Sequence, residues 1–554
     1  MKMFGKAIWC ILALAVSASA TNYTVMSNGG GNYTTIQSCA SAMSSGDTCT
    51  VYAGTYNEHV TVPAGAKGAY NTITVNGSDV VKVYSFSLNS HTKIVGNCPL
   101  DATLNSCGFT IGNASSPNNA CVSLPSNATD YYVTDNTMYA CGPFISEPGS
   151  GSNVSYGYIQ GNTMSYSCST SNSPNVCTAM QIHGDYHLIE NNYISHVSDG
   201  PYFGGAHNVM RKNVFGPINS SDCGSNSSNC HIDFMQADSN VNGGGPATTY
   251  LLLESNSVTN ATGSDIHAVG LFQGEACAGK CFNAIVRFHK AYHASGSGVV
   301  DDNSETSCPA WDHVKVYNND WIDMGASGGG ATNNTSYCST NAAYLNDIYY
   351  WPGAVNNFNP YFTVGGGGSS ASPFTVGSNL AFCGGGGCTS LHGHTYGSGN
   401  FTDDSGNQIA DPKFVNYSGN NFALSADSPA IGAATYLTTV LASDAGSGNS
   451  LKVSDADYFQ AGSPLDGVQS DCIAIDTLAN HACITSVNYS TGVLTLANSI
   501  TRTPGTSKVY LYSISDGTIV WTNGQPSPDL GAIPYASSTS SQPAPPTGLS
   551  ALVN

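Results

Sequence analysis

A short phrase recurs through the middle of the chain, between residues 131 and 323. Each copy holds an apolar residue, two variable residues, an Asn, one more variable residue and usually a second apolar residue, as in Tyr-Ile-Gln-Gly-Asn-Thr-Met at 158–164. The Asn position is filled in turn by Asn136, Asn162, Asn192, Asn213, Asn256, His289 and Asn319. Repeats at intervals of about 20–50 residues are typical of solenoid folds.

The phrases are short and rich in Thr, Tyr, Val and Ile, which favours strand–turn–strand units over helices. If each phrase belongs to one turn of a parallel β-coil, the Asn side chains stack about 4.8 Å apart and form an amide ladder. Insertions in the outer loops explain why the spacing is uneven. The repeats therefore predict an all-β protein, a right-handed parallel β-helix.

The first 20 residues have the pattern of a secretory signal peptide. Lys2 and Lys6 precede an apolar run at 7–16, and Ala18-Ser19-Ala20 supplies a cleavage site. The apolar run is too short to span a membrane, and we find no second one long enough to do so. The sequence therefore predicts a secreted, extracellular protein cleaved after Ala20.

The cysteines agree with export. Cys10 lies in the leader, and the other 18 of the 19 cysteines form an even set. Their spacing suggests nine disulfides between neighbours: 39/49, 98/107, 121/141, 168/177, 223/230, 277/281, 308/338, 383/388 and 472/483. An oxidising compartment is the firmer expectation. A structural zinc site is the rival interpretation, but the chain has no Cys-x2-Cys pair to support one.

The charge of the chain limits its partners. The formal net charge is −20, and only 9% of the residues are charged. Nucleic acids and anionic membranes are poor partners for such a protein. A surface rich in Gly, Ser, Thr and Asn suits a neutral glycan, so we expect a monomer that binds a polysaccharide or a cell-surface glycan.

Short motifs of a second kind occur near the start and near the end of the chain. Near the start are Tyr33-Thr-Thr-Ile-Gln37, Gly46-Asp-Thr48, Gly54-Thr-Tyr56 and Glu58, with apolar residues at helical spacing over 32–43. Near the end are segments 409–415, 421–424, 428–432 and 529–533. The first set resembles the entry of pectin-lyase-like β-helix proteins, where a short helix covers the open end of the core. The second resembles their closing coils. The superfamily includes lyases, hydrolases, esterases and non-enzymes, so the resemblance implies a fold and not a reaction.

The resemblance and the repeats together suggest a division of the chain. Residues 21–436 form the β-helix, 437–520 a small inserted β-domain of short alternating strands, and 521–536 a closing coil. The tail at 537–554 is rich in Ser and Pro and is expected to be a linker.

A row of charged residues lies just before the Asn positions. Glu190, Arg211, Glu254 and Arg287 alternate in sign on successive coils. Opposite charges stacked on one sheet face stabilise neighbouring strands by roughly 0.2–1 kcal/mol per pair. We therefore interpret this row as structural, although the two arginines could also serve as lyase bases.

The strands before each repeated phrase are expected at 179–183, 200–204, 231–236, 267–273 and 298–302. The resemblance implies that they form the first sheet, whose outer face and following turn carry the active site in this superfamily. Long insertions at 237–249, 274–282 and 303–313 follow these strands, and nine of the 14 histidines lie between 183 and 313. Loops on one edge of a rigid coil can build a groove.

Two groups of residues on this face are candidates for chemistry. If Ile232 and Phe234 fill the core, His231 and Asp233 project outward together as an acid–base pair. His183 and Tyr202 stand on neighbouring coils, where they could contact a sugar, although Tyr202 could also simply cover the sheet. A surface hydrogen bond without catalysis is the alternative interpretation of the His231–Asp233 pair.

A second group lies in the following loops. Asp301 and Asp302 close one first-sheet strand, and Glu275 and Lys280 lie in the preceding loop. Paired carboxylates are used in glycoside hydrolysis, and carboxylates on neighbouring coils can hold calcium. With calcium on a uronate, Lys280 could be the base of an eliminase. Solvated loop residues without a function are the alternative.

The motifs of individual families are missing. The chain has neither Asn-Thr-Asp nor Arg-Ile-Lys of polygalacturonases, and the region of Gly393-His394 lacks their Gly-His-Gly. Asp233-Phe234 matches a pair in pectin methylesterases, but their Gln-Asp-Thr-Leu is absent. The sequence predicts a secreted carbohydrate-active β-helix protein, either a polysaccharide lyase or a glycoside hydrolase. The alternative is a non-catalytic glycan-binding or structural coil.

Overall fold

The computed structural model describes most of the chain in segments. These are 20–100, 105–115, 119–149, 152–166, 178–197, 199–219, 222, 232–237, 247–262, 266–273, 281–294, 297–301, 311–324, 334–336, 341–353, 362–364, 374–384, 401–404, 406–522 and 524–535. The predicted signal peptide and the linker tail lie outside these segments, apart from Ala20.

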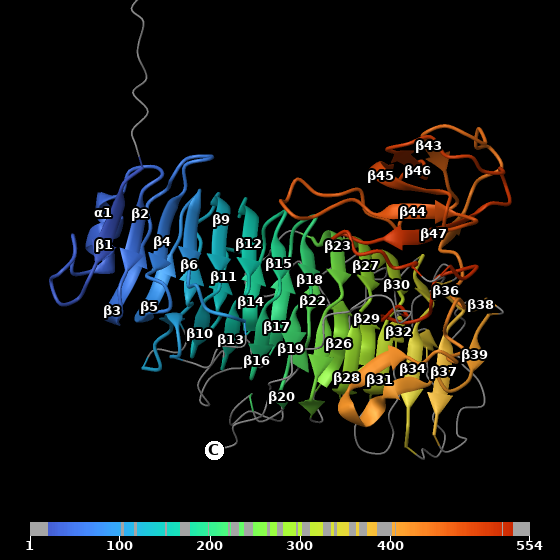
Figure 1. The fold of residues 1–554 in the computed structure, drawn as a ribbon, viewed down its shortest axis with the longest axis horizontal. Coiled ribbons are helices and arrows are strands. Elements are labelled where there is room, and N and C mark those ends of the chain that lie inside the picture. Colours follow the sequence, from blue (N-terminus) through green and yellow to red (C-terminus); the bar gives the residue numbers. More distant parts are fainter. Residues whose placement is uncertain are drawn as a thin grey trace, which may run out of the picture.

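The described residues form an elongated coil of parallel strands (Figure 1). One long side is a 14-stranded sheet. Its members, in spatial order, are β1 (Asn22–Val25), β2 (Thr48–Val51), β4 (Asn71–Val75), β6 (Thr92–Val95), β9 (Thr129–Thr134), β12 (Ser155–Gln160), β15 (Leu188–Glu190), β18 (Val209–Arg211), β23 (Thr249–Glu254), β27 (Cys281–Arg287), β30 (Trp311–Tyr317), β33 (Ala343–Leu345), β36 (Phe374–Gly377) and β38 (Phe401–Asp404).

Most other strands of the coil form a 23-stranded sheet with two columns, and β20 (Ile218–Asn219) and β25 (Ala261–Thr262) make a separate parallel pair. The downstream column follows the 14-stranded sheet in each coil: β7 (Gly108–Ile111), β10 (Thr137–Tyr139), β13 (Thr163–Ser165), β16 (Tyr193–Ser195), β19 (Val214–Phe215), β24 (Ser257–Thr259), β28 (Lys290–Ala294), β31 (Asp320–Met324), β34 (Ile348–Trp351), β37 (Leu380–Cys383) and β39 (Gln408–Ile409). The upstream column precedes the 14-stranded sheet: β8 (Val122–Ser123), β11 (Ile145–Ser146), β14 (Thr178–Ile182), β17 (Asp199–Phe203), β21 (Ile232–Asp233), β22 (Gln236–Ala237), β26 (Ile266–Gln273), β29 (Ser297–Asp301), β32 (Asn334–Ser336) and β35 (Phe362–Val364). Strands β3 (Gly54–Thr61) and β5 (Val80–Ser87) extend through both columns near the N-terminal end.

The repeated phrase sets which residues fill the core. Its first apolar position, three residues before the Asn, places Val133, Ile159, Ile189 and Met210 in direct register on successive strands, and all four are fully buried. Side chains alternate between faces in a strand, so the residues on either side of them point outward. This pattern confirms the predicted all-β parallel β-helix.

The Asn position of each phrase lies in the buried turn between the 14-stranded sheet and the downstream column. Asn162, Asn192, Asn213 and Asn256 each accept, through Oδ1, the backbone N–H of the preceding member, at 2.9–3.1 Å. Asn319 does the same for His289, at 2.8 Å. The series continues through Asp347 and Asn379, which the sequence pattern missed because Gly-rich stretches obscure the repeat there.

The N-terminal end carries the one α-helix among the described residues, α1 (Ile36–Ala42). Ile36, Cys39 and Ala40 are buried in the coil core, and the helix packs on β1, β2 and β3. Glu58 accepts the free backbone N–H groups of Ile36 and Gln37 at 3.2 and 2.8 Å, which satisfies the helix N-terminus. Glu58 and residues 33–37 are parts of the entry motif, so this contact explains why they occur together.

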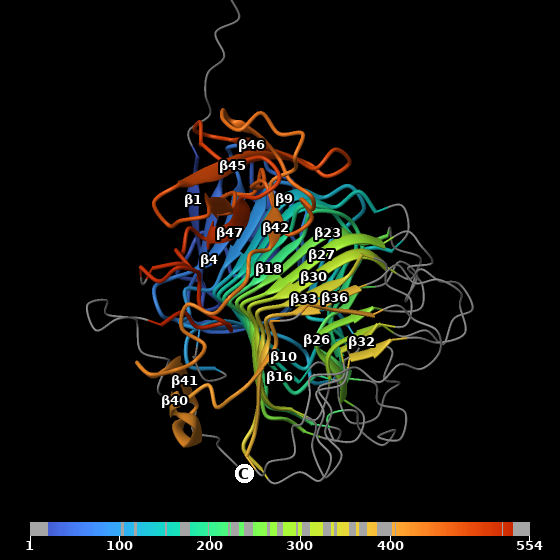
Figure 2. The same ribbon diagram turned by 90° about the vertical axis from the view of Figure 1, so that its right-hand side faces the viewer.

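A second, antiparallel sheet of six strands lies over the C-terminal half of the coil (Figures 1 and 2). We call it the small sheet; it consists of β42 (Thr438–Thr439), β43 (Ser450–Lys452), β44 (Cys472–Ile475), β45 (His481–Asn488), β46 (Val493–Leu496) and β47 (Lys508–Ser513). All but β42 match the short strands that alternation predicts at 450–453, 472–475, 482–487, 493–496 and 508–512. Its apolar residues share one core with the outward side chains of Leu188, Val209, Leu252 and Ile285 on the 14-stranded sheet.

The alternating charged row lies under this small sheet. Glu190 pairs with Arg211, and Glu254 pairs with Arg287, each through a hydrogen bond from Nε at 2.8 Å. The opposite charges therefore stack as predicted. They are buried and not exposed, however, because the small sheet covers them.

The chain after β39 does not form further coils of the kind expected from the resemblance. Strands β40 (Phe414–Asn416) and β41 (Asn421–Leu424) make an antiparallel hairpin around a 3-10 turn, η4 (Tyr417–Gly419). No strand is assigned in 524–535, where Gly531 and Ala532 bond to Asn346 and Asp320 at 2.9 and 3.0 Å.

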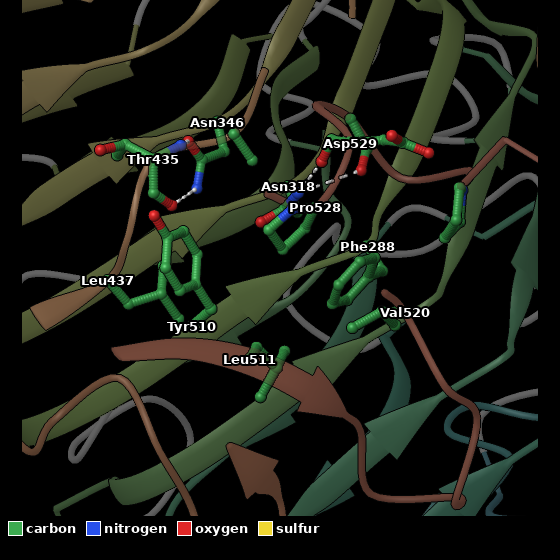
Figure 3. A pocket seen from close by; sticks show the side chains of 13 residues that line it. Phe288, Asn318, Asn346, Thr435, Leu437, Tyr510, Leu511, Val520, Pro528 and Asp529 are labelled. Carbon is green, nitrogen blue, oxygen red and sulfur yellow. Dashed lines mark hydrogen bonds between the residues drawn. The ribbon is translucent and has the colours of Figure 1, made fainter. Parts of the chain in front are cut away.

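Figure 3 shows the side chains that line the seam between residues 528–534, the small sheet and the coil. Phe288, Asn318, Tyr510 and Val520 are among its lining residues, and the free space there is about 10 Å³. A void of this size holds at most one water molecule. The seam is therefore packing and not a ligand site.

Four predicted disulfides are present among the described residues: Cys39–Cys49, Cys98–Cys107, Cys121–Cys141 and Cys472–Cys483. Cys281 and Cys383 are disulfide-bonded as well. No helix within the described segments is long and apolar enough to cross a membrane.

Candidate functional site

An uncharged polar row runs along the outer face of the upstream column, the face on which the sequence predicts a site. Direct register joins its members across successive strands: Ser87, Ser123, Ser146, Gln181, Tyr202 and Gln236. Ser87 and Ser123 share a hydrogen bond of 2.9 Å, and the Ser146 hydroxyl donates to Gln181 Oε1 at 3.2 Å. Hydroxyl and amide groups both donate and accept, so the row matches the hydroxyl groups of a sugar chain.

A cluster of polar groups around the Asp199 carboxylate lies beside this row at strands β17 and β21. The Tyr202 hydroxyl donates to Asp199 Oδ2 at 2.8 Å, and the backbone N–H of Asp233 donates to Asp199 Oδ1 at 2.9 Å. Asp199 thereby joins two of the residues predicted from the sequence, Tyr202 and Asp233. Two acids beside a phenol, on a face of neutral polar groups, form the candidate site.

Local packing explains why these groups meet. Phe234 enters the coil core, as expected, and packs against Phe215 and His289. Gly200 lies against the backbone carbonyl oxygens of Asp233 and Phe234, and a Cβ at this position would collide with both. The strand β17 therefore needs Gly200 so that the Asp233 backbone can approach Asp199.

The exposure of these residues differs from the prediction. Asp233 and Tyr202 were expected to project outward, yet Asp233 is 1% and Tyr202 6% exposed. A buried carboxylate needs hydrogen-bond donors, because removing its charge from water is costly. The backbone donor that Asp233 supplies and the Tyr202 phenol meet this need for Asp199.

His183 directly follows β14 and belongs to a different buried network. Its backbone N–H donates to Glu147 Oε2 at 2.8 Å, and its Nδ1 lies 3.2 Å from the Pro148 carbonyl oxygen. His187 Nε2 is 2.7 Å from Glu147 Oε1, which also accepts the Tyr131 hydroxyl at 2.7 Å. His183 is 3% exposed, and its contacts in this network hold the turn after β14. Its role in binding a sugar stays a prediction.

The charges in this network shift the pKa values of both ionisable partners. Burial by itself raises the pKa of the Glu147 carboxyl, but the charge and hydrogen bond of His187 outweigh it, and the pKa lies below its ordinary value. Burial by itself lowers the pKa of the His187 imidazole, but Glu147 outweighs it and the pKa is raised. The pair is therefore ionised and structural.

The remaining predicted residues cannot be placed beside the cluster. His231, Glu275, Lys280 and Asp302 lie outside the described residues, and only the backbone of Asp301, at the end of β29, is described. The described segments contain no group of three or more His, Cys, Asp or Glu side chains suited to a metal. The calcium hypothesis involved Glu275, Asp301 and Asp302, so it stays a prediction.

Sequence reasoning missed Asp199 and the covered face of the 14-stranded sheet. Asp199 was left out because the strand was expected to begin at residue 200. The covered face had a clearer signal: the first residue of each repeated phrase changes from Tyr132 and Tyr158 to Leu188, Val209 and Leu252. Outward apolar residues on successive coils indicate that another layer covers them.

Comparisons with known proteins add the following findings. No protein-family model matches the sequence, and no curated protein matches it. Among solved structures, an alginate lyase from Paenibacillus sp. str. FPU-7 is 12% identical with a TM-score of 0.35, over 70% of this chain and 99% of that one. The pectate lyase Pel9A is 10% identical with a TM-score of 0.31, over 76% of this chain and 93% of that one. The catalytic unit of a GH87 alpha-1,3-glucanase from Streptomyces thermodiastaticus strain HF3-3 is 13% identical with a TM-score of 0.33, over 68% of this chain and 65% of that one.

Proposed function

We propose that this protein is an extracellular carbohydrate-active enzyme that cleaves a neutral polysaccharide lying along the upstream column. The observation that carries the proposal is the uncharged row from Ser87 to Gln236, which passes the Asp199–Tyr202–Asp233 cluster. Sugar hydroxyls pair with hydroxyl and amide groups, and a cluster of acids supplies the proton transfers that glycosidic cleavage needs.

The chemistry of this face favours a glycoside hydrolase over a polysaccharide lyase. Glycoside hydrolysis uses one carboxyl as general acid and a second as base or nucleophile, and Asp199 and Asp233 supply two. A lyase needs a negatively charged uronate and a cation to neutralise it. The outward row from Ser87 to Gln236 contains no Lys or Arg among its described members. Lyase chemistry at the predicted Lys280 remains the second candidate, with the crowded histidines and acids of 183–313 as its support.

Tyr202 has a positioning role in this proposal. Its hydroxyl donates to Asp199 and so favours the ionised form of that carboxylate. Asp233 then acts as the general acid, and Asp199 as the base or nucleophile. His231, which the sequence places two residues before Asp233, is the predicted proton partner of the acid.

The test is a polysaccharide screen with two readouts. Release of reducing ends reports hydrolysis, and absorbance of an unsaturated product reports elimination. On an active substrate, Asp199→Asn and Asp233→Asn should each lower kcat by about 10²–10⁴-fold. Asp347→Asn is the matched control, because Asp347 is equally buried, lies on the other side of the coil and occupies a position where most coils have Asn.

Folding of each variant is checked by its melting temperature. Full activity in correctly folded Asp199→Asn and Asp233→Asn proteins would overturn the catalytic assignment. An unsaturated product that disappears in Lys280→Ala, but not in the Asp variants, would favour the lyase.

A further inference from the structure

Four aromatic rings stack along the corner where the chain enters the 14-stranded sheet. We call Tyr156, Tyr186, His207 and Tyr250 the aromatic column. Neighbouring ring centroids are 5.3, 5.0 and 4.7 Å apart, and neighbouring planes differ by 5–6°. All four residues have a left-handed backbone, with φ between 53 and 59°, which points the rings in the same direction on successive coils.

The stacked rings cover one another's faces, so a ligand meets their edges. The side chains of Tyr156, Tyr186, His207 and Tyr250 make no hydrogen bond to another described residue, and all four are half-buried. The column therefore presents a line of phenol hydroxyls and an imidazole nitrogen that are available as donors and acceptors.

The column leads into a cavity between the coil and the small sheet. The cavity volume is about 160 Å³, and the walls come from both layers. Val209, Leu252 and Ile285 of the coil and Val487 of the small sheet give it an apolar side. Its size is below the roughly 300–1,000 Å³ of pockets that hold drug-sized ligands, so it suits one small ring.

Polar groups line the rest of the cavity. His207, Asn283, Gln460 and Ser463 are among its lining residues, and Tyr489 lies 5.1 Å from Tyr250, ring to ring. Asn283 is buried, and its amide nitrogen donates to the Asp457 carbonyl and carboxylate oxygens at 3.2 Å, which leaves its amide oxygen as an acceptor. None of the described residues that line the cavity is Asp, Glu, Lys or Arg.

The one ionisable imidazole in the lining is kept neutral. Burial lowers the pKa of His207 below its ordinary value of 6.5, because a charged ring would lose its hydration there. A neutral wall with one apolar side and several donors and acceptors matches a ligand of the same character. A pyranose ring has this character, since its C–H face is apolar and its rim carries hydroxyl groups.

From this geometry we infer that the cavity between the aromatic column and the small sheet binds a single uncharged sugar ring, at a site separate from the Asp199–Tyr202–Asp233 cluster. The aromatic column extends the site along the coil toward Tyr156, so further sugar units of the same chain lie over the ring edges. The inference does not depend on cleavage at the upstream column, because the cavity is lined by the 14-stranded sheet with its entry corner and by the small sheet with its loop, and not by the upstream column.

The test uses saturation-transfer NMR on the full chain. The probes are the methyl glycosides of glucose, galactose and xylose, with glucuronate as the charged comparison. At least one neutral glycoside should show saturation transfer, and glucuronate should show several-fold less. Ala461→Phe and Ser463→Trp fill the cavity from the loop of the small sheet and should each reduce the transfer at least fivefold.

Two controls separate this site from the proposed catalytic site. Ala461→Ser keeps the cavity open and should bind as the unchanged protein does, and Asp233→Asn should leave the transfer unchanged. No transfer from any of the three neutral glycosides would overturn the inference, as would full transfer in Ala461→Phe and Ser463→Trp proteins with normal melting temperatures. Equal or stronger transfer from glucuronate would overturn the assignment to uncharged sugars.

Discussion

Arg287 donates two hydrogen bonds to Asp471, a residue 184 positions later in the chain. The two bonds measure 2.8 and 2.6 Å, and both side chains are fully buried between the coil and the small sheet. Arg287 also bonds Glu254 on the neighbouring strand and the hydroxyl of Tyr317. One guanidinium therefore links three neighbouring strands of the coil, β23, β27 and β30, to the residue that precedes β44 of the small sheet.

Removing one partner of the Arg287–Asp471 pair should lower the stability of the folded protein. Asp471→Ala leaves the buried Arg287 with less compensating charge, and we expect a loss of about 3–5 kcal/mol in the free energy of unfolding. Urea unfolding monitored by circular dichroism measures it. The exposed pair Lys413–Asp427, at 2.7 Å, is the control, and Lys413→Ala should cause no measurable change. Equal effects of the two substitutions would contradict this account.

The apolar residues under the small sheet should not tolerate charge. Leu252→Asp places an unpaired carboxylate in the core shared by the coil and the small sheet, and it should release the small sheet or destabilise the protein by several kcal/mol. Limited proteolysis within 437–520 reports release. Thr134→Asp lies on the same sheet face but outside the covered strands, so it should change stability by no more than about 0.5 kcal/mol.

The Glu147–His187 pair predicts a pH window of greatest stability. Glu147 has a lowered pKa, so its contribution is present above its ordinary value of 4.5 and is lost as the pH falls through the lowered value. His187 has a raised pKa, so its contribution is complete below its ordinary value of 6.5 and is lost as the pH rises through the raised value. Their joint contribution is therefore largest between pH 4.5 and 6.5.

Melting temperatures measured at a series of pH values between about 3 and 9 test this window. In Glu147→Gln the maximum should flatten, and the protein should lose about 3–5 kcal/mol near pH 5.5. A profile of unchanged shape in Glu147→Gln would show that the pair does not set the pH dependence.

His289 is the exception in the series of Asn residues, and replacing it should stabilise the protein in acid. Burial lowers the pKa of His289 to about 4, and its Nε2 has no hydrogen-bond partner among the described residues. The unfolded state therefore takes up protons first as the pH falls below 6.5, at a cost on the order of 3 kcal/mol by pH 4. His289→Asn should remove this loss, measured as the melting-temperature difference between pH 7 and pH 4. His196→Asn, at a partly exposed histidine, is the control and should keep it.

Local sequence pattern was enough to predict the coil. A buried apolar residue and a buried Asn at fixed positions of each phrase are needed on every turn, so the repeat is visible even where loops differ in length. Five of the six strands of the small sheet were also predicted correctly, because alternation and turn residues are local properties. The cysteine pairs 39/49, 98/107, 121/141 and 472/483 were close in sequence and so could be proposed directly.

The candidate site could be predicted only in part. Asp233 and Tyr202 were identified from strand parity, but the acid that joins them, Asp199, lies one residue outside the strand that the pattern predicted. His183 was identified by the same reasoning and proved to be held by Glu147, a residue 36 positions earlier. Parity within one strand predicts the face of a side chain, but contacts with neighbouring coils decide its partners and its burial.

The sequence by itself determined the coil, because each turn repeats the same short-range requirements for core and turn residues. Only the tertiary structure decided where the small sheet docks, which groups contact Asp199 and where the cavity lies. Those features depend on contacts such as Arg287–Asp471 and Tyr250–Tyr489, whose partners are far apart in the chain. A local sequence pattern cannot encode these contacts, because only the packing of the coil against the small sheet brings the partners together.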